Sequence, residues 1–205
     1  WAFLAVFKSF KKRSLMMFFM VSEKQRSKKK WLSIVAKGEF NNVKLGESLV
    51  ATPQHLLNKY LKINLMTLTN DPKKQGITVR FAVKNVDGNT GVAELVGYQM
   101  NTSHIKRLVR KAIKRIDDSF ILKTKDNVSY EVKPLLIARH KTTQSVATTI
   151  RKRVRELLQN SFQNMTSEDV FMYVITNKLQ MDVKNDVRKI YPLAISEIRV
   201  LKRLS

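Results

Sequence analysis

Lysine and arginine are the residues of this chain whose spacing points to a chemistry. Between His104 and Ile116 the sequence reads HIKRLVRKAIKRI, and its six cations alternate with apolar residues. The apolar residues recur at the i, i+3, i+4 and i+7 spacing of one helix face, which predicts an amphipathic helix over residues 103–115. The six cations on the other face repel one another, so a polyanion would stabilise this helix. The pattern therefore indicates contact with phosphate.

Further basic residues lie in short groups along the chain. Three lysines precede Trp31, whose ring could stack on an unpaired base, although a core position is the favoured interpretation. Each cation would neutralise a phosphate and release counterions. The predicted RNA-binding residues are Lys28, Lys29, Lys30, Trp31, Arg107, Arg110, Lys111, Lys114, Arg115, Arg139, Lys141, Arg151, Lys152 and Arg153.

The overall charge supports a polyanionic partner. The chain has 39 Lys and Arg against 16 Asp and Glu, a formal net charge of +23. Solubility of a small domain needs a net charge of only about 2 to 8. Nucleic acid is the first candidate partner and an anionic membrane surface the second; a solvated basic surface without a partner is the remaining interpretation. The 43% of hydrophobic residues is enough to form a core.

Residue patterns for catalysis or metal binding are weak. His55, His104 and His140 lie far apart and have no ligand-type residue at i+2 to i+4. The chain has no cysteine, which excludes thiolate metal sites and disulfides in this sequence. The carboxylates of Asp117 and Asp118 are more simply explained by an ion pair with Arg115 or a neighbouring base. We therefore expect neither an enzyme nor a bound cofactor or metal.

The elements that must position these cations can be predicted from periodicity. Alternating apolar residues predict strands, and Asp87-Gly88-Asn89 and Asp126-Asn127 predict hairpin turns. Strands fill the first half and helices the second, which favours an α+β fold with an antiparallel, β-barrel-like sheet flanked by amphipathic helices. The predicted strands are 31–36, 61–69, 77–86, 92–100, 119–125, 128–138 and 195–204, and the predicted helices are 53–60, 103–115, 146–162 and 167–190.

Residues 1–30 differ from the rest of the chain. Two seven-residue apolar runs, 1–7 and 15–21, are separated by basic residues, and each is far shorter than the roughly 20 residues that span a bilayer. We predict an N-terminal extension and basic tail over 1–30, of which 1–19 is upstream-translated or otherwise extraneous sequence. The alternative is an amphipathic membrane-surface anchor. A single RNA-binding domain is predicted over 31–205.

Five segments, in order, resemble one family. They are KKKWLSIVAKGEFNNVKLGESL (28–49), NVDGNTG (85–91), IKRLVRKAIKRID (105–117), VKPLLIA (132–138) and KIYPLAISEIRVLK (189–202). They are similar to the archaeal and eukaryotic small-subunit ribosomal protein family S-one-e, also called S-three-a-e. Ala36-Lys37 stands where the family usually has Ala-Pro, and Leu57-Asn58-Lys59 stands where Leu-Gly-Arg is usual. The short C-terminus resembles archaeal members.

The resemblance implies a structural role in the cytoplasmic ribosome. It implies a barrel-like sheet with surrounding helices, located on the platform of the small subunit near the mRNA exit and the 3′ end of the rRNA. Neighbouring ribosomal proteins, mRNA and initiation factors are the implied further partners, and no membrane is expected. A general basic RNA- or DNA-binding protein outside the ribosome is the main alternative, followed by a membrane-surface protein and an enzyme.

Overall fold

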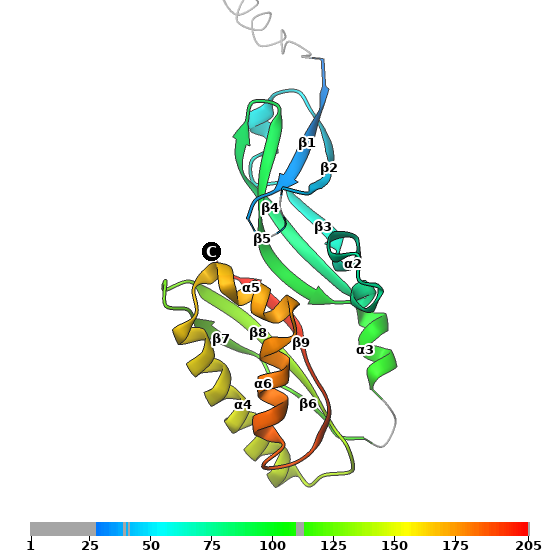
Figure 1. The fold of residues 1–205 in the computed structure, drawn as a ribbon, viewed down its shortest axis with the longest axis vertical. Helices are drawn as coiled ribbons and strands as arrows, with labels where there is room; N and C mark the ends of the chain where they lie inside the picture. The colour runs from blue at the N-terminus through cyan, green and yellow to red at the C-terminus, as the bar shows by residue number, and fades with distance from the viewer. Residues whose placement is uncertain (1–27, 39, 41, 110–112, 205) are drawn as a thin grey trace, which may run out of the picture.

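One nine-stranded sheet runs through the length of the molecule (Figure 1). The computed structural model describes residues 28–38, 40, 42–109 and 113–204. The strands are β1 (Lys30–Ala36), β2 (Lys44–Val50), β3 (Tyr60–Asn64), β4 (Ile77–Asp87), β5 (Thr90–Met100), β6 (Arg115–Asp117), β7 (Phe120–Lys123), β8 (Ser129–Ala138) and β9 (Leu193–Arg203). The helices are η1 (Pro53–Leu56), α2 (Leu65–Thr69), η2 (Pro72–Gly76), α3 (Thr102–Leu108), α4 (Gln144–Asn164), α5 (Ser167–Ile175) and α6 (Lys178–Val187).

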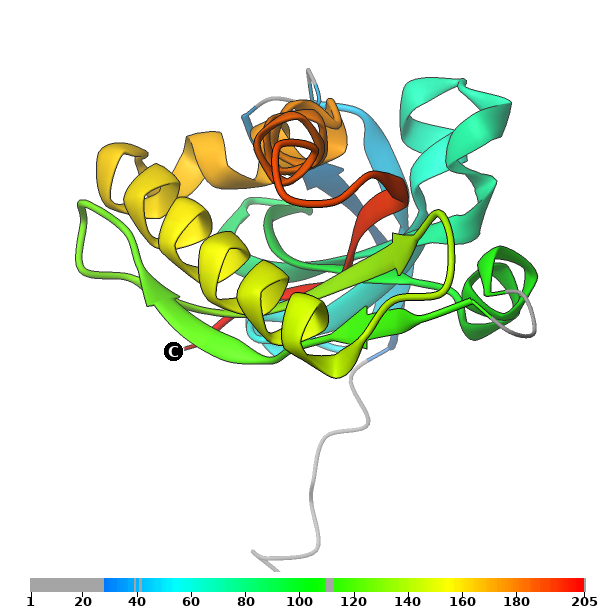
Figure 2. The same cartoon turned by 90° about the horizontal axis from the view of Figure 1, so that it is seen from below.

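The α+β class is confirmed, but the sheet contains one parallel strand pair in addition to the expected antiparallel pairs. The main path of the sheet is β2-β1-β5-β9-β8-β6, with β4 joining β5 to β3, and β7 pairing with β8. Helices α4, α5 and α6 cover one face of the half that contains β6 to β9 (Figures 1 and 2). Strands β1 and β5 pair in parallel, so the sheet is not wholly antiparallel; the three strands between them allow the chain to return in the same direction.

The barrel-like closure is not confirmed. In the half that contains β1 to β5, strands β2 and β3 each pair with a single neighbour in the described part of the chain. Both therefore remain sheet edges rather than closing on each other.

The two predicted hairpins are confirmed. Strands β4 and β5 pair along their length around a turn in which Gly88 has φ +57°. Strands β7 and β8 pair around Asn127, whose φ is 59°. Glycine and asparagine are the residues that adopt this left-handed backbone at least cost.

The predicted strand over 61–69 is wrong in its second half. Residues Leu65–Thr69 form α2, because Asn64 Oδ1 accepts a hydrogen bond of 3.0 Å from the Met66 backbone N–H and caps the first turn. Asn70, at φ 53°, ends the helix in the left-handed conformation. The helix predicted over 53–60 is a shorter 3-10 turn, η1.

The predicted basic helix over 103–115 is also wrong in extent. Helix α3 ends at Leu108, and Arg115 already belongs to β6. The reason is a long-range contact. Ile116 pairs with Leu136 of β8 and is buried in the core, which the strand conformation of β6 allows. Repulsion among the cations gives the longer helix no compensating stability.

The C-terminal helices follow the predicted pattern with one break. Helix α4 buries Ala147, Ile150, Val154, Leu158 and Phe162 along one stripe, as its periodicity indicates. The single helix predicted over 167–190 is instead α5 and α6. Asn177 separates them with φ 61° and accepts a hydrogen bond from the Gln180 side chain. Within the described residues, no helix is both long and apolar enough to span a membrane.

A bidentate ion pair joins α4 to α6. Arg153 donates from Nε to Asp186 Oδ2 at 2.6 Å and from Nη2 to Asp186 Oδ1 at 3.2 Å. Glu156 lies at a looser 3.6 Å from Arg153. The hydrogen bond from Arg153 holds the pKa of Asp186 below its usual range.

A three-residue pairing joins the two halves of the sheet. Gly97, Tyr98 and Gln99 of β5 pair with residues 202, 201 and 200 of β9. Tyr98 and Leu201 face each other here, and both are buried; Leu201 also lies opposite Val132 of β8. The apolar core is therefore continuous across the junction.

Replacing Leu201 by alanine should weaken this junction. Deleting a fully buried leucine side chain leaves a cavity, so Leu201→Ala should lower the free energy of unfolding by about 2 to 5 kcal/mol in urea titrations. Leu49→Ala, at a half-exposed position of β2, should change it by no more than about 0.5 kcal/mol. Equal effects of the two substitutions would contradict the assignment of the junction.

The ion pair between α4 and α6 should make stability depend on pH. Because the pKa of Asp186 is lowered in the folded state, its contribution is present above the unfolded-state pKa and is lost as the pH falls through the folded-state value. Asp186→Asn should therefore lower the unfolding temperature at neutral pH, and its difference from the parent should disappear in acid. Glu156→Gln, which removes the looser partner of Arg153, should change little. A neutral-pH unfolding temperature unaffected by Asp186→Asn would count against the ion pair.

Candidate nucleic-acid interface

The predicted basic arm lies at the start of β1. Lys28, Lys29, Lys30 and Trp31 are all exposed. The favoured core position of Trp31 is wrong, because its side chain is 66% exposed. Strand β1 turns Leu32, Ile34 and Ala36 into the core, so the alternation of a strand directs Trp31 to the other face. This leaves its ring free of the core and beside three lysines.

The cations predicted to share one helix are divided in the structure. Arg107 is exposed on α3, near the point where Ile105 packs against Met100 and Leu135. Arg110 and Lys111 lie outside the described residues. Lys114 and Arg115 lie at β6, on the far side of that segment. The described residues of this segment thus form no continuous helical face for the group.

The segments that carry Lys114, Arg139 and Lys141 lie together, where β8 leads into α4 at the end of the molecule drawn lowest in Figure 1. The Lys114 carbonyl accepts a hydrogen bond from Ala138 N–H at 3.1 Å, which brings it beside Arg139. Arg139 N–H in turn donates to the Pro192 carbonyl at 3.2 Å. The Tyr191 hydroxyl donates to the Lys141 carbonyl at 3.5 Å. The ends of β6 and β8 and the start of β9 are therefore held together.

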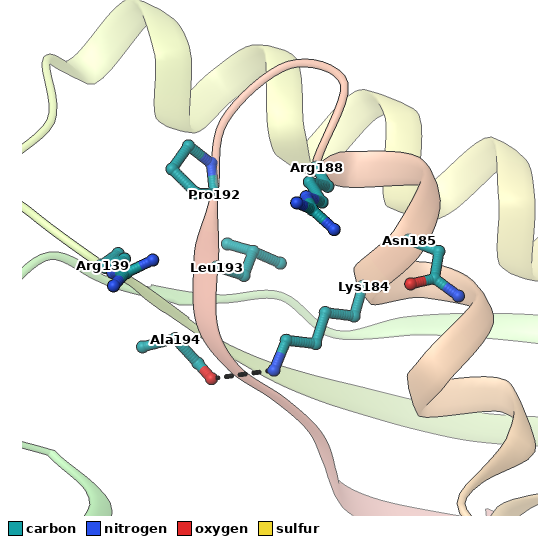
Figure 3. A pocket seen from close by; sticks show the side chains of 7 residues that line it. All are labelled: Arg139, Lys184, Asn185, Arg188, Pro192, Leu193 and Ala194. Carbon is teal, nitrogen blue, oxygen red and sulfur yellow. Dashed lines mark hydrogen bonds between the residues drawn. The ribbon is translucent and has the colours of Figure 1, made fainter.

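A pocket of about 410 Å³ opens at this end (Figure 3). Three cationic side chains from two segments line it: Arg139 after β8, and Lys184 and Arg188 at the end of α6. The other lining residues are Asn185, Pro192, Leu193 and Ala194, so no carboxylate faces the pocket among them. Arg139 and Arg188 are exposed. We call the following residues the basic end: Lys114, Arg115, Arg139, Lys141, Lys184 and Arg188.

Some charges of the basic end also make contacts within the protein. Lys184 Nζ donates to the Ala194 carbonyl at 3.2 Å. Burial raises the pKa of Glu197, and the charge of Lys184 opposes this shift in part. Lys114 Nζ donates to Gln144 Oε1 at 2.9 Å. Arg115 forms the ion pair with Asp117 that the sequence predicts. Arg139, Lys141 and Arg188 have no side-chain ion pair among the described residues, so they are the most available to an external anion.

The three predicted cations of α4 differ in their surroundings. Lys152 is exposed, and Arg151 is half-buried. Arg153 forms an ion pair with Asp186 of α6, so its guanidinium already stabilises the contact between the two helices. An exposed arginine with a free guanidinium is the better phosphate ligand, because forming a new contact then breaks no existing ion pair.

Sequence reasoning missed Lys184 and Arg188. Both lie near the end of α6, with the i, i+4 spacing that places them on one side of a helix. That local signal was present in the sequence. Their convergence with Arg139 was not, because the residues are far apart in the chain and are brought together by the pairing of β8 with β9 and the contact of α6 with β9.

The charge of the pocket suits an anion. Among the described residues, no group of three or more His, Asp or Glu side chains is placed to hold a metal ion. Cations from two segments converge on the pocket and can each neutralise a phosphate. The arrangement therefore has the chemistry to hold an anion.

Comparison with known proteins identifies relatives that cover most of this chain. The small ribosomal subunit protein eS1 of Nanoarchaeum equitans is 31% identical over 84% of this chain and 87% of its own length. The eS1 protein of Methanothrix thermoacetophila is 30% identical over 83% and 81%. That of Saccharolobus islandicus is 27% identical over 86% and 85%. These names are those of ribosomal proteins and not of enzymes.

A family-wide comparison covers most of the chain, including every described element from β1 to β9. The model of the Ribosomal S3Ae family matches residues 21–205. The resemblance inferred from the five sequence segments is therefore confirmed, and the chain belongs to the Ribosomal S3Ae family.

Proposed function

We propose that this chain is a structural, non-enzymatic constituent of the small ribosomal subunit in the cytoplasm, and that its basic end binds rRNA. The observation that carries the proposal is the convergence of Arg139, Lys184 and Arg188 on one pocket that has no lining carboxylate. Phosphate contacts made from a rigid sheet and helix would fix the position of the protein on folded rRNA. The relatives named small ribosomal subunit protein eS1 supply the context.

The position within the subunit extends this proposal. We infer a place on the platform near the mRNA exit, beside neighbouring ribosomal proteins and in reach of mRNA and initiation factors. The support is the family resemblance. The cations outside the basic end remain predicted RNA ligands: Lys28–Lys30 with Trp31, Arg107, Arg110, Lys111 and Arg151–Arg153.

Binding by the basic end predicts a specific dependence on salt. The triple variant Arg139→Ala, Lys141→Ala and Arg188→Ala removes three exposed cations without breaking an ion pair. Each lost phosphate contact should reduce the slope of log K against log salt by roughly one unit, so the variant should lose about three units. Filter binding of the full chain to its own small-subunit rRNA at several salt concentrations measures this slope.

A charge-matched control separates this site from general basicity. Lys73, Lys125 and Lys178 are exposed and lie outside the basic end. Replacing these three with alanine lowers the net charge equally but should leave most of the slope in place. If both triple variants reduce the slope by the same amount, the basic end is not a preferred site. If bulk RNA competes as well as the cognate rRNA, the protein is a general basic RNA-binding protein instead.

A further inference from the structure

A second surface with RNA-binding chemistry lies on the open face of the sheet. We propose that the face formed by β3, β4, β5 and β9 binds an unpaired RNA strand, with Tyr60 stacking on a base and Arg80, Lys84 and Lys202 contacting phosphates. The inference rests on the proposed function, because both require RNA as the partner. The inference adds a second site, away from the basic end, and this site binds single-stranded RNA.

Strand register places three cations of this face, Lys62, Arg80 and Lys202, in one row. Lys62 of β3 pairs with Arg80 of β4, Arg80 with Gly97 of β5, and Gly97 with Lys202 of β9. Residues that are paired across strands point to the same face of a sheet. The row therefore holds three cations with a glycine between two of them.

The row faces away from the helices. Tyr130 of β8 packs its ring against Phe162 of α4 and Phe171 of α5, with centroid distances of 6.1 and 5.7 Å. The next residue, Glu131, pairs with Lys202. Because successive side chains of a strand alternate between faces, Glu131 and Lys202 point to the side opposite the helices.

Two adjoining hollows lie on this face. One has a volume of about 60 Å³ and the other about 660 Å³, and Arg80 and Lys202 line both. Gly97 lines the smaller hollow, where its lack of a side chain leaves space between the two cations. Tyr60 and Lys84 line the larger hollow. No Asp or Glu is among the lining residues of either hollow.

The carboxylate of Glu131, at the end of the row, does not form an ion pair with Lys202. Glu131 lies next to Lys202 but forms an ion pair of 2.7 Å with Lys133. The hydrogen bond from Lys133 and the charges of Lys133 and Lys202 lower the pKa of Glu131, so it is ionised and already neutralised. Arg80, Lys84 and Lys202 have no ion pair among the described residues. The surface therefore complements a polyanion.

The exposed ring of Tyr60 favours an unpaired RNA strand over a duplex. Its side chain is 65% exposed at the first residue of β3, beside the cations of the larger hollow. An exposed ring in a basic groove is the combination with which proteins bind single strands, where each stacked base contributes about 1–3 kcal/mol. In a duplex the base faces are covered by their neighbours, so Tyr60 could not stack there. An unpaired strand uses both the ring and the cations.

Removing the Tyr60 ring tests the proposal. Tyr60→Ala in the full chain should weaken binding of a fluorescent uridine oligomer of about 12 nucleotides by about 5- to 100-fold in anisotropy titrations, and Tyr60→Phe should stay within about twofold. Met181→Ala, an exposed apolar position on α6, which lies on the other side of the sheet, is the control and should have no effect. Affinity for a duplex of the same length should not change.

The outcomes separate this inference from the proposed function. If Tyr60→Ala leaves single-strand affinity unchanged while the triple variant of the basic end still flattens the salt slope for rRNA, the open face is not a binding site and the proposed function stands. If the unmodified chain binds neither RNA form, both fail. Unchanged unfolding midpoints of the Tyr60 variants would show that a loss of affinity is not a loss of folding.

Photocrosslinking in intact small subunits identifies the source of the strand. An RNA crosslink on the peptide that contains Tyr60 supports the site, and sequencing the attached nucleotides distinguishes rRNA from mRNA. Crosslinks found on other peptides of this chain, with none on the segments that carry Tyr60, Arg80, Lys84 or Lys202, would overturn the proposal.

Discussion

Three residue pairs between β5 and β9 hold the two halves of the molecule in one sheet. Leu201 and Tyr98 fill the core side of this junction, while Gly97 and Lys202 form its open side. The same pairing thus joins the core and sets the spacing of the cations across β4, β5 and β9. Because the strands are hydrogen-bonded to one another, those cations are positioned by the sheet rather than by flexible loops.

The distribution of carboxylates explains why the positive charge gathers where it does. Asp186, Asp118 and Glu131 each pair with a cation next to the helices or on the sheet. The pairs of Asp186 and Asp118 join different elements, whereas Glu131 pairs with Lys133 of its own strand. The pocket at the basic end and the hollows of the open face have no carboxylate among their lining residues. A bound phosphate backbone would relieve the self-repulsion that this arrangement creates.

Local patterns predicted the elements that depend on local interactions. The stripe of α4 and the hairpin of β4 and β5 follow directly from periodicity and turn residues. The prediction of a basic helix up to residue 115 was wrong because Ile116 pairs with Leu136 of β8, a contact that no local pattern contains. The alternation of Leu32, Ile34 and Ala36 could have placed Trp31 outside the core. The pocket formed by Arg139, Lys184 and Arg188 and the row of Arg80 and Lys202 depend on strand pairing between distant segments, so their convergence could not be predicted from spacing.

The central claim is that this chain is a component of the small ribosomal subunit held by contacts with rRNA. Sucrose-gradient sedimentation of a lysate from the source cells, with quantitative mass spectrometry of each fraction, tests it most directly. The account predicts one copy of the chain per small subunit at low and moderate salt, with release only when high salt screens the phosphate contacts. Migration at the top of the gradient at every salt concentration would contradict it.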